Sequence, residues 1–194
     1  MRTAAPLESG SDQMTTFEGS GSAEFADETV FRDAVSRFAT GVTIVTAASG
    51  GQDYGTTVSA FTSLSLEPPM LLVCLNRSSV THDAIRDAGF FGVSVLAEGQ
   101  GDLAQHFARK GEDKFTRVEV VRPDSGVPIV AGALASFECR VAETVTGGTH
   151  TVFLAEVLSA AAAEGDPLTY FRGKFGRLGG AVQQTAVSPE YATA

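Results

Sequence analysis

A hydroxyl-rich stretch at residues 56–65 has residue types suited to holding a flat aromatic ligand. Small side chains at Thr57, Ser59 and Ala60 let a ring approach the backbone closely. The hydroxyls offer more hydrogen bonds than a strand core needs, and a double proline closes the stretch. The candidate ligand-binding residues here are Thr56, Thr57, Val58, Ser59, Ala60, Ser63 and Ser65.

A second polar segment, residues 76–81, follows after six apolar residues. One cation, Arg77, meets three hydroxyls at a predicted helix start, where free N–H groups and the helix dipole favour a phosphate. The candidate phosphate-binding residues are Asn76, Arg77, Ser78, Ser79 and Thr81. Each segment alone is read more simply as a surface strand or an ordinary helix cap. Their adjacency favours a ring site beside a phosphate site, which is what a flavin nucleotide requires.

Composition excludes several classes of partner. The chain has 194 residues, enough for one domain with a substantial core, and a net charge of -9. It has no cluster of Lys and Arg, so we expect neither nucleic acid nor an anionic membrane surface as a partner. No apolar run approaches the roughly 20 residues that span a bilayer. The polar N-terminus has no secretory pattern, and we predict a cytoplasmic protein.

The cysteines and histidines do not suggest a metal site. Cys74 and Cys139 each lie in an apolar, strand-like run, and we interpret both as buried free thiols, although the sequence leaves a disulfide open. His82, His106 and His150 are widely spaced, and no Cys/His pair has the spacing of zinc ligands. His82 and His106 fall on predicted helices and are interpreted as structural or solvated.

The predicted elements are mainly strands connected by hairpins. We assign residues 1–25 to a disordered tail, 26–180 to one domain and 181–194 to a C-terminal tail.

Asp27 is the expected cap of a first helix that ends at Gly41, with an apolar face of Val30, Phe31, Val35 and Phe38. Further helices are predicted at 79–87 and 101–110, and strands at 42–46, 54–65, 70–75, 90–96, 134–146, 150–162 and 167–171. Strand 70–75 is apolar throughout, and we expect it to be buried on both faces. These elements predict a closed or nearly closed antiparallel barrel of about six strands with helices at its rim.

Residues 99–104 match the dinucleotide-binding pattern G-x-G-x-x-A, and Glu119 lies about 20 residues further on. We reject this motif, because Glu98 and Asp102 would place two carboxylates beside a pyrophosphate. The surrounding chain shows hairpins rather than alternating strands and helices. Asp102 is better explained as a favourable charge at a helix N-terminus.

Five segments that occur in order along the chain resemble one known family. They are residues 38–46 (FATGVTIVT), 57–69 (TVSAFTSLSLEPP), 76–81 (NRSSVT), 113–115 (DKF) and 167–173 (PLTYFRG). Together they resemble the short-chain flavin reductases, the reductase components of two-component flavin-dependent monooxygenases, over about residues 28–178. The resemblance implies an FMN-binding split β-barrel, a homodimer, and NADH or NADPH as the electron donor for FAD or FMN. It also implies that reduced flavin diffuses to a separate monooxygenase.

The resemblance also implies a role for each candidate residue. Residues 56–60 would run beside the isoalloxazine ring, with Ser63 and Ser65 near the ribityl chain and phosphate. Arg77, Ser79 and Thr81 would hold the phosphate. The remaining implied residues are Phe107, Ala108 and Arg109 in a covering loop, His150 over the flavin, and Tyr170, Arg172 and Gly173 beside the nicotinamide dinucleotide.

His150 is the candidate catalytic residue, with two roles open. It orients the nicotinamide, or it supplies a proton near the flavin. Family members commonly carry Gly-Asp-His where this chain has Gly148, Thr149 and His150, so the carboxylate that would orient the ring is missing. Lys114 and Phe115 have two open roles as well, closing the flavin site or anchoring a loop.

Three other functions compete with the reductase. The first is a flavin-binding protein that serves as a sensor or store without catalysis. The second is an oxidase of the pyridoxamine-phosphate type, which would need more basic residues than this acidic chain offers near its candidate sites. The third is a cofactor-free β-barrel interaction module. The sequence does not choose between FAD and FMN, or between NADH and NADPH.

Overall fold

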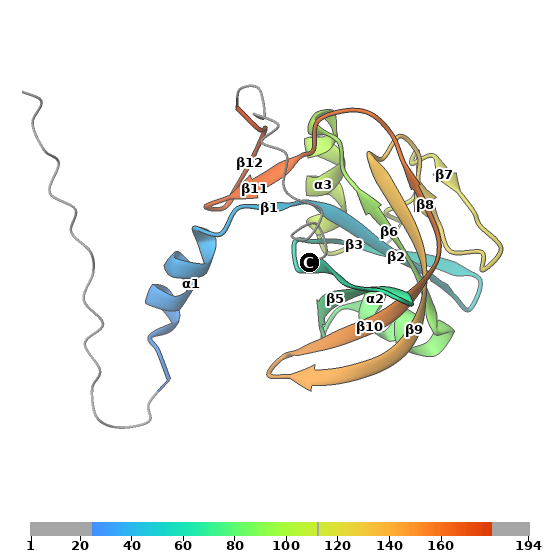
Figure 1. Ribbon diagram of the computed structural model, residues 1–194, viewed down its shortest axis with the longest axis horizontal. Coiled ribbons are helices and arrows are strands. Elements are labelled where there is room, and N and C mark those ends of the chain that lie inside the picture. The colour runs from blue at the N-terminus through green and yellow to red at the C-terminus, as the bar shows by residue number, and fades with distance from the viewer. Residues whose placement is uncertain (1–24, 112, 180–194) are drawn as a thin grey trace, which may run out of the picture.

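The computed structural model describes residues 25–111 and 113–179. The predicted tails, apart from residue 25, lie outside the described residues. The described chain is mainly β-structure, as predicted, with three α-helices around one large antiparallel sheet (Figure 1). No helix in the described ranges is long and apolar enough to cross a membrane.

The large sheet has seven strands in the order β3-β2-β6-β9-β10-β5-β4. Their bounds are β2 Thr43–Ser49, β3 Gln52–Val58, β4 Phe61–Leu66, β5 Pro69–Asn76, β6 Phe90–Val95, β9 Ala135–Gly147 and β10 His150–Ala162. Every pairing between neighbours is antiparallel. The two edge strands, β3 and β4, follow one another in the chain with two residues between them, so the sheet must curl until its edges meet (Figure 1).

This arrangement confirms the prediction of a mainly β, split-barrel fold. Strand pairing does not close the barrel in the described chain, because β3 pairs only with β2 and β4 only with β5. β3 also contacts β5 across the opening. The split therefore lies beside the short link formed by Ser59 and Ala60.

Two clusters of buried side chains fill the curled sheet. The larger one includes Val45, Phe91 and Phe153 from the strands. Helix α2, Val80–Ala88, closes it by burying Ala84 and Ile85. The smaller cluster joins Ile44 and Leu96 to helix α3, Gly101–Ala108, through its buried Ala104 and Phe107.

Two strand predictions were wrong in ways that matter for the site. The expected long strand 54–65 is two strands, broken at Ser59 and Ala60. The 70–75 strand buries only one face: Leu71, Val73 and Leu75 are buried, and Met70, Leu72 and Cys74, on the other face, are partly exposed. A strand between hairpin neighbours packs one face on the core, whereas burial on both faces belongs to sheets covered by helices on both sides.

The smaller elements frame the sheet. β1 Thr40–Gly41, β11 Thr169–Phe171 and β12 Lys174–Gly176 form a three-stranded sheet. β7 Val120–Val121 pairs with β8 Ile129–Val130. β7, β8 and β12 were not predicted from the sequence. The segment 99–104 forms a short 3₁₀ helix, Glu98–Gln100, and the start of α3 after an antiparallel strand, which confirms that it is no dinucleotide-binding motif.

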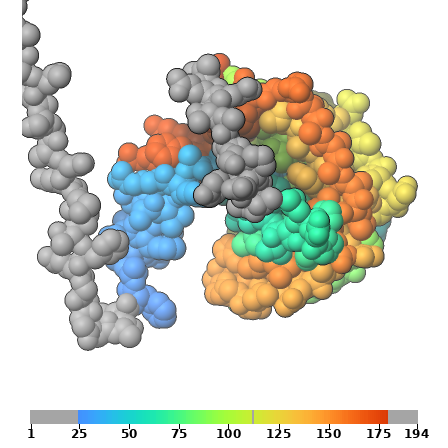
Figure 2. All heavy atoms as spheres, viewed as in Figure 1, coloured from blue at the N-terminus to red at the C-terminus, as the bar shows by residue number. Residues whose placement is uncertain are grey.

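Helix α1, Glu28–Ser36, begins at Asp27, whose side chain accepts hydrogen bonds from the N–H groups of Thr29 and Val30. The helix ends earlier than predicted, because Gly41 lies in β1. Figures 1 and 2 show α1 standing apart from the large sheet, with an open space between it and the β9–β10 hairpin. Its apolar residues are therefore uncovered within the described chain: the exposed fractions of Val30, Phe31, Val35 and Phe38 are 65%, 60%, 54% and 76%.

We predict that Gly55→Ala destabilises the fold by about 1–3 kcal/mol through overpacking. Gly55 lies in β3, and a Cβ atom there would stand 2.6 Å from Cε1 of the buried Phe107 and 3.2 Å from Cζ of Phe115. The matched control is Gly147→Ala at the end of β9, where a Cβ atom would meet nothing within 4 Å. Urea unfolding measures both free energies, and equal losses would contradict the prediction.

Candidate functional site

A pocket of about 270 Å³ opens at the split between β3 and β5. Its walls come from four places: the end of β3 with the link to β4, the end of β5, the start of α2 and the start of β10. The lining residues are Thr56, Thr57, Val58, Ser59, Ala60, Cys74, Leu75, Asn76, Ser79 and His150. The structure thus brings the two polar segments singled out in the sequence, and His150, to one cavity.

The β3–β4 link forms the first wall and is held by its neighbours. Thr43 Oγ1 donates to the Val58 carbonyl at 2.8 Å, and the Cys74 N–H donates to the Ala60 carbonyl at 3.0 Å. Thr57 Oγ1 donates to the carbonyl of Ala104 in α3 at 2.6 Å, so this hydroxyl is already used by the fold. The wall consequently presents backbone and small side chains to a ligand.

The second wall is a turn that leads into α2. Asn76 Oδ1 accepts hydrogen bonds from Ser78 N at 2.9 Å and from Ser78 Oγ at 2.8 Å. Ser79 is the N-cap residue of α2 but makes no side-chain cap hydrogen bond. Thr81, in the first turn of α2, is buried, and its Oγ1 has no partner in the part of the chain that the structure describes. This helix N-terminus therefore keeps hydrogen-bonding capacity near the pocket.

The third wall is the β9–β10 turn, clamped by Arg77. The Arg77 guanidinium donates to the Gly148 carbonyl at 2.9 Å, and its backbone N–H donates to the Thr149 carbonyl at 3.0 Å. His150 pairs with Asn76 in the β10–β5 register, so it stands directly beside the α2 turn. Its Nδ1 lies 2.9 Å from Oγ1 of Thr149, which makes a hydroxyl the group that orients the ring.

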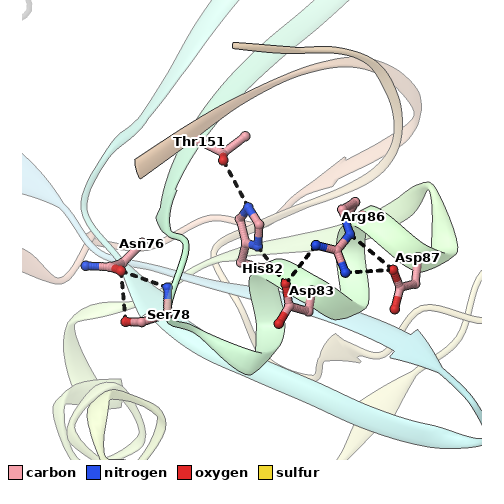
Figure 3. Close-up of polar contacts among 7 residues, drawn as sticks. All are labelled: Asn76, Ser78, His82, Asp83, Arg86, Asp87 and Thr151. Atoms are coloured by element: carbon pink, nitrogen blue, oxygen red, sulfur yellow. Dashed lines mark hydrogen bonds and ion pairs between the residues drawn. The ribbon is translucent and has the colours of Figure 1, made fainter. Parts of the chain in front are cut away.

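A buried histidine that sequence analysis treated as structural holds two of these walls together. His82 Nε2 lies 2.9 Å from Oγ1 of Thr151, the residue after His150, and His82 Nδ1 lies 3.1 Å from an oxygen of Asp83 (Figure 3). Asp83 also pairs with Arg86 at 3.2 Å. His82 thereby fixes α2 against the start of β10.

Several predicted site residues lie outside this pocket. Ser63 and Ser65 lie in β4, where Ser65 Oγ accepts a hydrogen bond from the Glu67 N–H at 3.1 Å. Phe107 is fully buried beneath β3. Arg77, Ser78 and Thr81, at the turn into α2, do not line the pocket either. The remaining residues, exposed in the described chain, are Ala108 at the end of α3, Arg109 directly after it, and Tyr170, Arg172 and Gly173 in the β11–β12 hairpin.

A second cavity, of about 590 Å³, lies at that hairpin. Its lining residues are Thr169, Phe171, Arg172, Lys174, Phe175, Gly176 and Arg177. Arg172 lies 3.9 Å from Asp33 of α1, and Arg177 pairs with Glu98 at 2.9 Å. Thr169, which lines the second cavity, pairs with Gly41, and Val58, which lines the first pocket, pairs with Thr43. The two cavities therefore lie beside positions of the β1–β2 segment that are only two residues apart.

Cys74 and Leu75 line the first pocket but were not predicted as site residues. Exposure alternates along β5, and this alternation distinguishes Cys74 from its buried neighbours. It could be predicted only if the strands that flank β5 were known. Burial raises the pKa of the Cys74 thiol. Burial and the nearby Glu138 raise the pKa of Cys139 to about 12, and both cysteines are free, as predicted. No three acidic, His or Cys residues within the described ranges are grouped as metal ligands.

Comparisons with known proteins converge on one group. The model of the flavin reductase like domain matches residues 35–179. The reductase component of a 4-nitrophenol 4-monooxygenase/4-nitrocatechol 2-monooxygenase from Rhodococcus opacus is 52% identical over 78% of this chain and 82% of its own. The NADH-dependent FMN reductase SmoA of Agrobacterium fabrum is 43% identical over 76% and 84%. The structure of the Streptomyces globisporus NADH:FAD oxidoreductase SgcE6, with NAD and FAD fragments, superposes with a TM-score of 0.75 at 38% identity over 80% and 97%.

We predict that a bound flavin protects Cys74 from alkylation. Cys74 is the only one of the two thiols that lines the pocket, and Cys139 is fully buried, so a Cys139→Ala variant gives a single-thiol reporter. FMN at ten times its Kd is expected to slow maleimide labelling about tenfold, because only the unliganded fraction reacts. Mass spectrometry follows the labelling, and an unchanged rate would place the flavin elsewhere.

Proposed function

The chain belongs to the flavin reductase like family, and we propose that its hydride-transfer site is the pocket at the split between β3 and β5. It is an NAD(P)H-dependent flavin reductase that uses FAD or FMN. The observation that supports the location is the meeting of the β3–β4 link, the α2 N-terminus and His150 at one cavity. A bound flavin supplies the acceptor for the hydride of NADH or NADPH.

The residues present fit a flavin nucleotide. Ser59 and Ala60 leave room for a ring beside the backbone, whose N–H and carbonyl groups would meet its polar edge. The uncapped first turn of α2, with the unpartnered Oγ1 of Thr81 behind it, would receive a phosphate together with Ser79. Arg77 lies two residues before Ser79, and its guanidinium, which donates to the Gly148 carbonyl of the β9–β10 turn, would add its charge to the first turn of α2.

His150 is proposed to orient the nicotinamide rather than to supply a proton. Hydride transfer needs no acid from the protein, and its main requirement is that donor and acceptor atoms lie about 3–3.5 Å apart. The contact with the Thr149 hydroxyl and the pairing opposite Asn76 hold the ring at the pocket wall. Removing the imidazole should therefore affect the KM for NADH more than flavin affinity.

The cavity at the β11–β12 hairpin is proposed to hold the phosphate-bearing part of the dinucleotide. Arg172, Lys174 and Arg177 line it in a chain whose overall charge is -9, so local cations must outweigh an unfavourable field. Tyr170 and Gly173 would flank it from the same hairpin. The closeness of the two cavities across β1–β2 lets one dinucleotide reach from one to the other.

We propose that the reduced flavin serves a separate monooxygenase; the Rhodococcus opacus relative is named as the reductase component of a monooxygenase. We also propose a homodimer. The uncovered apolar face of α1 and the partly exposed Met70 and Leu72 of β5 are surfaces that a second copy of the chain would bury.

Ser59→Leu is expected to lower the affinity for FAD, FMN and riboflavin alike, by about tenfold or more, because the added side chain occupies the place of the ring. Steady-state oxidation of NADH and NADPH with each flavin in turn measures this effect and the preferences of the wild type. The control, Thr62→Leu, places the same side chain at an exposed residue of β4 outside the pocket. If Ser59→Leu oxidised NADH at the wild-type rate, the β3–β4 link would not be part of the flavin site. If the wild type bound flavin but did not oxidise NADH, the protein would be a flavin store or sensor.

The homodimer predicts a sedimentation mass of about twice 20.2 kDa. Phe31→Glu should shift this mass toward one chain, because it places a carboxylate on the apolar face of α1. Arg32→Glu introduces the same group at the next position of the helix, where the side chain is already charged and exposed, and it should leave the dimer intact. A wild-type mass near that of one chain would contradict the proposal.

A further inference from the structure

Lys114 occupies the gap between β3 and α3. Its ammonium donates to the Gly55 carbonyl at 3.0 Å and to the Phe107 carbonyl at 2.9 Å. Lys114 is partly buried, and this burial lowers the pKa of its ammonium. Lys114 does not line the pocket proposed for the flavin, and its two hydrogen bonds anchor the loop between β3 and α3.

The loop that carries Lys114 is itself fixed to α3. His106 Nε2 lies 2.8 Å from the Lys114 carbonyl. Phe115 packs edge-on against Phe107, with ring centroids 5.2 Å apart. Lys114 is therefore a rigid bridge rather than a surface side chain that samples many positions.

The strand at the other end of this bridge is an edge strand. β3 pairs with β2 on one side and with no strand on the other in the described chain. Thr56, Thr57 and Val58, which come directly after Gly55, line the flavin pocket. Within the described residues, two side chains join this part of β3 to α3 by hydrogen bonds: Thr57, which donates to Ala104, and Lys114.

We propose that Lys114 is a positioning residue for flavin binding. By bonding the Gly55 and Phe107 carbonyls at once, it fixes the separation of β3 and α3, and with it the place of the backbone at residues 56–58 relative to the ring. Gly55 permits this close approach because a Cβ atom would overlap Phe107. This inference rests on the proposed flavin pocket.

The chain offers a matched control in Arg122. Its guanidinium pairs with both carboxylate oxygens of Asp53 in β3 and donates to the Gly126 carbonyl at 2.8 Å. Arg122 thus ties β3 to a loop through a cation, as Lys114 does, but it acts two residues before Gly55. Asp53 does not line the pocket.

The test compares Lys114→Met with Arg122→Met. Methionine keeps an unbranched side chain and removes the charged donors. We expect Lys114→Met to raise the Kd for FMN and FAD about tenfold, as losing one charge-assisted hydrogen bond would, and to leave the KM for NADH within about twofold. Arg122→Met should lose a similar amount of thermal stability without this change in Kd. Lys114→Arg, which keeps a charged donor, should recover part of the flavin affinity.

Hydrogen exchange gives a readout that needs no catalysis. Amides of residues 55–58 should exchange faster in Lys114→Met, whereas Arg122→Met should affect the strand around Asp53 instead. Unchanged flavin affinity in Lys114→Met, or an equal loss in both variants at equal thermal stability, would overturn the positioning role. A wild type that binds flavin but oxidises no NADH would contradict the proposed function alone, and a wild type that binds no flavin would overturn both.

Discussion

The unpaired break between β3 and β4 is the constraint on which the site depends. Both strands are edges of one sheet, and only Ser59 and Ala60 join them, so the chain must bring two edges together without pairing them. Backbone groups at such an opening need other partners. Val58 and Ala60 obtain theirs from Thr43 and Cys74, and what remains open is a cavity walled by main chain and small side chains.

The other walls are fixed by contacts that cross the sheet. Arg77 bonds the β9–β10 turn to the turn before α2, and His82 bonds α2 to Thr151 (Figure 3). Lys114 bonds α3 to β3. Each contact joins elements that are distant in sequence, so the placement of the pocket walls relative to one another depends on a few charged or buried polar side chains. In the site that we propose, a net charge of -9 would be compatible with phosphate ligands because the favourable groups are local and held in place.

The types of the elements could be predicted from local sequence signals. Features that depend on strand pairing between distant residues could not be predicted in this way. Asp27 as a cap, the helix predicted at 79–87 and the β9–β10 hairpin each depend on a few neighbouring residues, and the structure confirms them. The break at Ser59 has no glycine or proline to mark it, because it results from the sheet having two edges at that point. The one-sided burial of β5 and the uncovered face of α1 likewise depend on which elements, or which second copy, lie alongside.

The hydroxyl-rich character that first marked the site has a different origin from the one the sequence suggested. Thr57 donates to α3, Ser65 accepts from the turn at Glu67, and Ser78 donates to Asn76, so these hydroxyls satisfy edges and turns of the fold. Ser59 and Ser79 are the serines that line the pocket. In the flavin site that we propose, a ring would be held mainly by backbone groups, and side-chain identity would matter little beyond small size. Motifs of this kind would then be loose one by one and specific only together, and the positions proposed to fix the backbone, such as Gly55 and Lys114, would carry information that the ligand-facing residues do not.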